Sequence, residues 1–366
     1  MEDRPPTTVT PQKDHDRLRL VDPEDTRGTR IKVVGVGGAG GNALDNMIRE
    51  SRAGVEFIAA NTDRQALEAT LAPTKLQMGP SLTKGRGAGA DAEVGHRSAT
   101  ESYQEISHQL AGADMVFITA GMGGGTGTGA APVIAEIARE LGCLTVAVIT
   151  RPFDFEGKKR KVQAEQGVRA LHGTVDTLIT ISNQRLLRVV DRGTSLRDAF
   201  KVADDVLGRA VEGIANLLVM PGLINLDFAD IRTVMSGAGL AVMGVGVAQG
   251  SGRGVEASQM AASSPLLEDV SIDGARGVLL NITGGHDMTL DDVHDAASII
   301  HEAAHEEAHV IFGAVTDDRL QEELRVTVIA TGFYHQSPDA RAMGPPARGG
   351  QDLPGLEGMP RRRRGS

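Results

Sequence analysis

A single cysteine, Cys143, is present, so no disulfide can form within the chain and nothing points to an oxidising compartment. It precedes the apolar run 144–149, where a buried, inert thiol is expected rather than a nucleophile. No apolar run approaches the ~18 residues that a membrane span requires. The charged start has no apolar segment typical of a secretory signal. These absences predict a soluble, cytoplasmic protein.

The chain also has fewer positive than negative side chains: 38 Lys and Arg against 48 Asp and Glu, which gives a net charge of −10. Nucleic-acid affinity depends largely on cations that meet phosphates, so nucleic acid is not an expected partner. Glycine is abundant instead, with 46 residues gathered in clusters that suggest backbone-lined loops. The 366 residues allow about two domains.

Two ends of the chain, residues 1–30 and 334–366, lack periodicity, and we expect both to be disordered. Between them, short apolar runs alternate with helical patterns. The expected strands are 31–35, 55–60, 114–119, 144–149 and 177–181, with helices at 42–49 and 132–141. Strands separated by helices indicate an α/β fold with a parallel sheet covered on both faces. This first domain is expected to span residues 31–194.

A long central helix is expected over residues 195–222. Apolar residues recur there at helical spacing from Leu196 to Leu218, Ser195 and Asp198 resemble a capping box, and Pro221 and Gly222 end the pattern. A smaller α/β domain is expected over residues 223–333. Its strands lie near 277–282, 309–315 and 325–330, with a helix capped by Thr289 and Asp292.

The first glycine cluster, residues 35–42, lies between an expected strand and an expected helix. Its glycines allow close backbone approach to an anion, and the helix start adds free N–H groups and a positive dipole end. Gly35, Gly37 and Gly40 also spell the dinucleotide fingerprint, with Asp63 placed 23 residues after Gly40 as a candidate ribose ligand. A dinucleotide oxidoreductase is therefore an alternative, and a tight turn without a ligand is another.

The second glycine cluster, residues 121–129, follows another strand and opens another helix. A dinucleotide fold needs one pyrophosphate cradle, whereas two cradles fit a triphosphate held from two sides. Thr126 and Thr128 can add hydroxyl donors. The motif G-x-x-x-x-G-K-[ST] does not occur, so a P-loop NTPase is excluded.

Several motifs together resemble a known family. Residues 124–129, Gly-Gly-Thr-Gly-Thr-Gly, resemble the tubulin signature, and segments 61–63, 151–160, 225–232 and 263–268 resemble FtsZ, the bacterial cell-division homologue of tubulin. The match keeps order and spacing from about Ile31 to Phe333. It implies a GTPase that polymerises head to tail into the contractile Z ring, located in the cytoplasm at the division septum.

The resemblance also assigns the nucleotide-binding residues. It implies that guanine stacks on Phe200 and that Asp204 accepts hydrogen bonds from its N1–H and 2-amino group. Glu156 and Arg160 are implied on the ribose or phosphate side, although without the family they would be interpreted as an ordinary helix i,i+4 pair. The phosphates are implied to contact Gly38, Ala39, Gly40, Gly41 and Asn42 in the first cluster and Gly125, Thr126 and Gly127 in the second.

Asn225, Asp227 and Asp230 are implied to form the catalytic loop, which orients water for attack on the γ-phosphate, with Mg²⁺ as the expected cation. Taken alone, the two aspartates would more often be turn and helix-cap residues. Asp204 and Asn225 are 21 residues apart, roughly 30 Å at the rise of a helix. The loop would therefore complete the site of a neighbouring subunit. A homologue that binds but no longer hydrolyses nucleotide is disfavoured by the retained aspartates.

Two further features have competing interpretations. Residues 301–305 and 305–309 match the zinc motif H-E-x-x-H, but His294, His301 and His305 border an apolar stripe as in any amphipathic helix, so no metal site is expected. Family members bind membrane adaptors through a terminal peptide, which residues 352–356 resemble only loosely. Four arginines, 361–364, have three interpretations: a contact with acidic lipid, a contact with a protein, or a solvated end.

Overall fold

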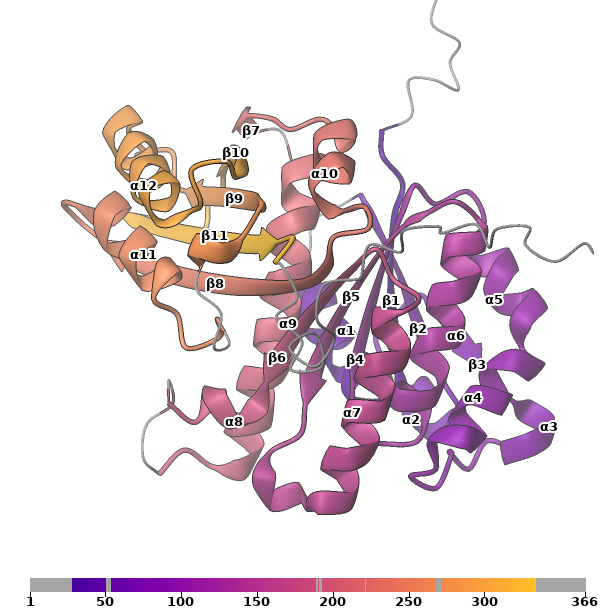
Figure 1. Cartoon of the computed structure of the whole chain (residues 1–366). Helices are drawn as coiled ribbons and strands as arrows, with labels where there is room; N and C mark the ends of the chain where they lie inside the picture. Colours follow the sequence, from indigo (N-terminus) through magenta and orange to yellow (C-terminus); the bar gives the residue numbers. More distant parts are fainter. Residues whose placement is uncertain are drawn as a thin grey trace, which may run out of the picture. The chain divides into compact units, whose positions relative to one another are not determined.

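Eleven strands of the described chain form one continuous sheet in the order β3-β2-β1-β4-β5-β6-β8-β11-β9-β10-β7 (Figure 1). The computed structural model describes residues 28–50, 54–188, 190, 193–220, 222–267 and 272–333. These all belong to one compact unit, and the predicted disordered segments lie almost entirely outside them. The expected α/β fold with a mostly parallel sheet is confirmed.

The first six strands are parallel to their neighbours and bring their carboxyl ends to one edge. They are β1 (Ile31–Val36), β2 (Val55–Asn61), β3 (Thr74–Gln77), β4 (Met115–Gly121), β5 (Leu144–Arg151) and β6 (Thr177–Ser182). Alternate residues face opposite sides. Val33 and Phe117 belong to one buried cluster, whereas Val34 and Ile118 belong to the other. Both faces are therefore apolar, as a covered parallel sheet requires.

Helices cover both faces of this half. One face packs against α1 (Gly37–Glu50), α2 (Arg64–Ala69) and the long α9 (Leu196–Val219). The other packs against α4 (Ala92–Glu101), α5 (Tyr103–Leu110), α6 (Thr126–Glu140) and α7 (Lys158–His172). Three shorter elements, α3 (Pro80–Thr83), η1 (Asp154–Glu156) and α8 (Asn183–Leu186), complete the connections.

The central helix α9 begins as the sequence predicts, because the Ser195 side chain accepts a hydrogen bond from the Asp198 N–H. It ends at Val219, three residues before the predicted end. Leu207 and Ile214 are buried, but Leu196 and Phe200, at the start of the same stripe, are exposed. The first turns of α9 therefore present apolar side chains to solvent.

The second half contains β7 (Gly222–Ile224), β8 (Gly239–Gln249), β9 (Gly277–Gly284), β10 (His309–Thr316) and β11 (Glu323–Thr331). Its helices are α10 (Phe228–Met235), α11 (Arg253–Ala262), η2 (Ile272–Gly274) and α12 (Leu290–Ala303), and the predicted capping box of Thr289 and Asp292 is confirmed. Residues 177–179 of β6 pair with residues 239–241 of β8, which joins the two halves into one sheet.

Both glycine-rich helices begin earlier than predicted. The sequence placed the starts at Asn42 and Pro132, whereas α1 begins at Gly37 and α6 at Thr126. Pro132 favours a first turn, but it lies inside α6, where it removes the N–H that the Thr128 carbonyl would accept and its ring crowds that carbonyl. The first glycine cluster is thus largely the first turns of α1, whereas the second is a short turn that continues into the first turn of α6.

Among the helices of the described residues, none combines the length and the apolar character that crossing a membrane would take.

Candidate functional site

The two glycine-rich segments meet at the carboxyl edge of the parallel sheet. Strands β1 and β4 are neighbours, β1 runs directly into α1, and a short turn joins β4 to α6. A Cβ added to Gly37 would lie 2.9 Å from the backbone nitrogen of Gly127, so the two backbones are in contact. Two helix N-termini, each with unpaired N–H groups and a positive dipole end, therefore lie side by side. This arrangement suits an anion with several phosphates.

The predicted residues of the first segment divide into two roles. Gly38 and Gly41 have open space where a Cβ would lie, and Asn42 is exposed, so all three can face a ligand. Ala39 is half-buried. Gly40 is buried, and its Cβ would lie 2.5 Å from the carbonyl oxygen of Thr119 on β4. Its contribution is to let α1 approach the sheet closely.

The second segment shows the same division. Gly124 has open space at its Cβ position and Thr126 is half-buried, so this part of the turn faces outward. A Cβ on Gly125 would lie 2.9 Å from backbone atoms of Asp91, and one on Gly127 would lie 2.8 Å from a carbonyl oxygen of β4. These two predicted residues make room for neighbouring backbone.

Thr128 differs from Thr126. Its side chain is buried and its hydroxyl accepts a hydrogen bond of 2.8 Å from the Gly123 N–H. Thr128 therefore shapes the turn, and its burial disfavours the expectation that it donates to a ligand.

The dinucleotide alternative cannot be judged from topology, because the strand order 3-2-1-4-5-6 is also that of dinucleotide folds. Its candidate ribose ligand is Asp63. One carboxylate oxygen of Asp63 accepts hydrogen bonds from the N–H groups of Gln65 and Ala66, so Asp63 caps α2. This cap, and the second helix N-terminus beside the first, disfavour the dinucleotide reading.

A cavity of about 580 Å³ lies between α1 and the first turns of α9. It brings together three residues of the predicted nucleotide site, Asn42, Phe200 and Asp204. Phe200 is 37% exposed, and its ring packs edge-on against buried Phe153 with centroids 5.3 Å apart. A supported, half-exposed aromatic ring is suited to stack on a planar base. The other lining residues are Asp45, Asn46, Arg49, Arg197, Asp198 and Lys201.

Asp204 is the carboxylate in this cavity with a strongly perturbed pKa. Burial, and then the neighbouring charge of Asp205, raise the pKa of Asp204 to about 7. Paired hydrogen-bond donors on a ligand would favour the ionised form and offset the desolvation. The N1–H and 2-amino groups of guanine form such a pair.

Glu156 and Arg160 form an ion pair of 3.1 Å, but they do not share a helix. Glu156 ends η1 and Arg160 lies in the first turn of α7, so the ordinary helix-pair interpretation is wrong. The Glu156 carboxylate also accepts the Phe153 N–H, which fixes the turn behind Phe200. A Cβ on Gly123 would lie 2.6 Å from Cγ of Arg160, so the arginine lies against the second glycine segment.

The three predicted catalytic residues lie beyond the other end of α9, and all three are exposed. The Asn225 side-chain oxygen accepts the Gly222 N–H at 2.7 Å, which shapes the loop. Asp227 occupies the N-cap position of α10, yet its side chain accepts no capping hydrogen bond, and Asp230 lies in the first turn. Within the described part of the chain, no hydrogen bond or ion pair engages either carboxylate. Their availability favours the catalytic interpretation over a capping role.

Sequence reasoning missed Asn183. It follows β6 at the same carboxyl edge, it is 5% exposed, and its side-chain oxygen is buried without a hydrogen-bond partner among the described residues. Such an oxygen is costly to leave unpaired, so Asn183 is a further candidate to contact a ligand. Its place at a strand end was the available signal, because ligands of parallel sheets bind there.

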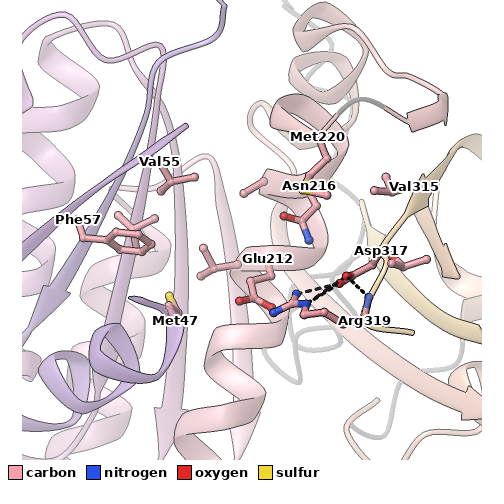
Figure 2. A pocket seen from close by; sticks show the side chains of 13 residues that line it. Met47, Val55, Phe57, Glu212, Asn216, Met220, Val315, Asp317 and Arg319 are labelled. Carbon is pink, nitrogen blue, oxygen red and sulfur yellow. Dashed lines mark hydrogen bonds and ion pairs between the residues drawn. The ribbon is translucent and has the colours of Figure 1, made fainter. Parts of the chain in front are cut away.

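A second, small cavity is lined by α1, α9, β1 and β2 and, from the second half, by β9, β10 and the turn after β10 (Figure 2). Its walls are apolar at Met47 and Phe57 and charged at Asp317 and Arg319, which are paired at 2.8 Å. Glu212 of α9 points toward Arg319 (Figure 2). The cavity volume is about 30 Å³, which suits one or two water molecules and not a nucleotide.

The zinc motif does not form a metal-binding helix face. Helix α12 ends at Ala303, so the expectation that His301 and His305 share a helical stripe is wrong. The His301 ring nitrogen Nδ1 is 2.9 Å from the Ala297 carbonyl oxygen, and Nδ1 of His305 accepts the Glu307 N–H. The second match begins beyond α12 and ends at His309, the first residue of β10, as predicted. No group of three or more metal-ligating side chains occurs within the described ranges.

We expect the His301→Ala variant to keep the unfolding temperature of the unmodified protein, because His301 has no zinc to lose. Both proteins are dialysed against EDTA, and thermal unfolding is followed by circular dichroism. Elemental analysis that found one zinc per chain, absent from His301→Ala, would contradict this expectation.

Comparison with known proteins identifies the two halves. Residues 30–191 match the Tubulin/FtsZ family GTPase domain, and residues 239–334 match the FtsZ family C-terminal domain. The structure of an FtsZ dimer from M. jannaschii is similar, with 43% identity, a TM-score of 0.81, and coverage of 85% of this chain and 93% of that chain. CetZ2 from Haloferax volcanii, in a GTPgS-bound protofilament, shares the fold at 19% identity and a TM-score of 0.71, over 86% of this chain and 96% of that one.

The cavity at Phe200 and Asp204 is termed the base cavity, because it would hold the nucleotide base. This cavity and the two helix N-termini lie within the matched GTPase domain, apart from the residues that α9 contributes. The match to FtsZ from M. jannaschii extends over both halves of the chain. The chain therefore belongs to the Tubulin/FtsZ family and is a GTPase.

Proposed function

We propose that this GTPase polymerises head to tail and that each active site is completed between adjacent subunits. The observation that carries the proposal is the separation of the two half-sites along α9. From Phe200 to Val219 the chain is helical over 20 residues, and the 19 steps between these two residues span about 28 Å. Figure 1 shows α8 near one end of α9 and β7 and α10 near the other.

The chain after α9 does not return to the base cavity. The estimate from sequence counted residues up to Asn225 as helical, but the segment after the helix enters β7, which pairs antiparallel with β10. This strand has three residues and covers only about 10 Å. This separation supports the proposal that the catalytic loop is out of reach of the nucleotide of its own subunit.

A neighbouring subunit can supply the catalytic loop that the chain itself cannot bring to its own nucleotide. The exposed loop with Asp227 and Asp230 would meet the nucleotide face of the next copy and orient the attacking water. Such a contact joins two different surfaces, so it repeats and builds a filament. Mg²⁺ would be held mainly by the phosphates and water, as this cation prefers, and would neutralise developing charge there.

The base would be guanine. Phe200 would stack on the ring, and ionised Asp204 would accept its two adjacent donors. Adenine presents an acceptor at the N1 position, so it cannot satisfy the carboxylate in the same way. The phosphates would contact the N-termini of α1 and α6, with Arg160 beside them.

The similar proteins support assembly, because one is described as an FtsZ dimer and another as a protofilament. We infer a role in the Z ring at the division septum, in the cytoplasm, from the FtsZ likeness. A bacterial source stays a prediction, since the similar structures come from M. jannaschii and Haloferax volcanii. Binding of membrane adaptors would involve residues 352–356, and residues 361–364 would contact acidic lipid or a protein. Both segments lie outside the described residues.

Light scattering and phosphate release with GTP, GDP or NADH test the proposal together. We expect assembly and phosphate release with GTP only. Leu223→Asp should abolish assembly while GTP binding is kept, because Leu223 is 70% exposed on β7 beside the catalytic loop. Leu141→Asp, at an exposed position after α6, is the matched control and should assemble normally. Phosphate release by Leu223→Asp at the unmodified rate would contradict a shared site.

A further inference from the structure

Thr62 contacts the second glycine segment on its buried side. It follows β2, its side chain is fully buried, and its hydroxyl oxygen lies 2.6 Å from the hydroxyl oxygen of Thr126, the first residue of α6. Among the described residues, Thr126 is the one hydrogen-bond partner of the Thr62 hydroxyl. The Thr62 carbonyl oxygen is separately held by the Gly87 N–H and the Thr83 hydroxyl, so the residue is fixed in place.

The direction of this hydrogen bond follows from burial. If Thr126 donated, the hydrogen of Thr62 would be buried without an acceptor, which folded proteins avoid. Thr62 therefore donates and Thr126 accepts. Thr126 is half-buried and lies two residues after Gly124, whose Cβ position faces open space. The hydroxyl hydrogen of Thr126 can therefore point outward.

We propose that Thr62 is a positioning residue that fixes the Thr126 hydroxyl as a hydrogen-bond donor toward a phosphate oxygen of the bound nucleotide. A single threonine hydroxyl rotates freely, and an outward donor loses this freedom at binding. Thr62 reduces this loss of rotational entropy at binding, because the Thr126 hydroxyl oxygen already accepts its hydrogen bond in the free protein. The inference rests on the proposed phosphate contact of Thr126.

A double-mutant cycle tests the proposal through the dissociation constant for GDP. GDP is used with protein diluted until sedimentation shows only monomer, so that neither hydrolysis nor assembly contributes. Thr126→Val should weaken GDP binding about tenfold, the usual loss of a hydrogen bond to a charged group. Thr62→Val should weaken it roughly threefold to tenfold, and Thr62→Ser should restore binding to within about twofold.

The decisive measurement is the effect of Thr62→Val in the Thr126→Val background, where we expect no further loss. A structural role of Thr62 would instead lower the affinity by the same factor in both backgrounds, and that result would overturn the proposal. If Thr126→Val left the affinity unchanged, the phosphate contact would fail together with the proposal, whereas assembly-dependent hydrolysis would still stand on its own tests. Circular dichroism verifies the fold of each variant, and Thr62→Ala replaces Thr62→Val in the cycle if the valine variant does not fold.

Discussion

Asp230→Ala is expected to bind GTP as tightly as the unmodified protein but to hydrolyse it on the order of 100-fold more slowly. Asp230 is exposed in the first turn of α10, about 28 Å of helix away from the base cavity, so its removal leaves the nucleotide pocket of the same chain intact. Equilibrium binding and phosphate release, measured on the same preparation, separate the two effects. A matching loss of GTP affinity would place Asp230 in its own pocket and contradict the shared site.

The complementary variant must lose nucleotide binding and keep its catalytic loop. Gly125→Asp is a natural choice from the sequence, but a side chain there would collide with Asp91 and displace α4. Gly124→Asp is preferable, because its Cβ meets open space and the added charge repels phosphate. Gly124→Asn is the neutral control of similar size and should retain most binding.

Mixing the two inactive variants should restore hydrolysis. In an equal mixture, one of four junction types pairs the catalytic loop of Gly124→Asp with the nucleotide of Asp230→Ala, so activity should reach at most about a quarter of the unmodified value. Specific activity of the unmodified protein should also rise with concentration above a threshold. Constant specific activity down to concentrations at which sedimentation shows only monomer would refute the mechanism.

Asp204→Asn should lose most of the preference for GTP over ATP, because an amide offers one acceptor oxygen and adds a misplaced donor. The unmodified protein should show a pH dependence that the variant lacks. Burial and Asp205 raise the pKa of Asp204 to about 7 in the nucleotide-free state, and in the proposed site guanine would bind the ionised form. Affinity should therefore be full above about pH 8 and fall roughly tenfold for each pH unit below 7.

Two controls separate this effect from misfolding. A carboxyl with a raised pKa stabilises the folded state at low pH, and that stability is lost as the pH rises through about 7. Asp204→Asn should therefore unfold at the same or a higher temperature at pH 8 without nucleotide. Asp205→Asn removes the second cause of the raised pKa and should move the pH profile of GTP affinity to lower pH. A flat profile for the unmodified protein would exclude Asp204 as the titrating group.

Features that depend on a few neighbouring residues were predictable from the sequence. Five of the six strands of the parallel half, all except β3, were found as expected, and so were the start of α9 at Ser195 and the capping box before α12. Apolar periodicity and capping need only residues within one or two turns, so the sequence contains the whole signal. The strand β8 was missed, although it has 11 residues.

The reason for that miss is a contact with a distant helix. Gly244 and Gly246 interrupt the apolar pattern of β8, and a Cβ at either position would lie about 2 Å from a carbonyl oxygen of α11. Glycine in a strand here marks the close approach of another backbone. The same cause explains part of the second glycine cluster, because a Cβ on Gly129 would lie 1.9 Å from the Ala92 carbonyl oxygen of α4.

The sequence by itself determined the chemistry of the site: glycines at two strand ends, an aromatic and a carboxylate one helical turn apart at Phe200 and Asp204, and a loop with two aspartates after a long helix. Only the tertiary structure decided which groups meet. The order of strands places β1 beside β4, and with them the two helix N-termini. It also brings Thr62 against Thr126 and places the loop of Asp227 and Asp230 beyond the opposite end of α9 from Phe200 and Asp204. Spacing along the chain contains none of these contacts, because they depend on how strands distant in sequence pair.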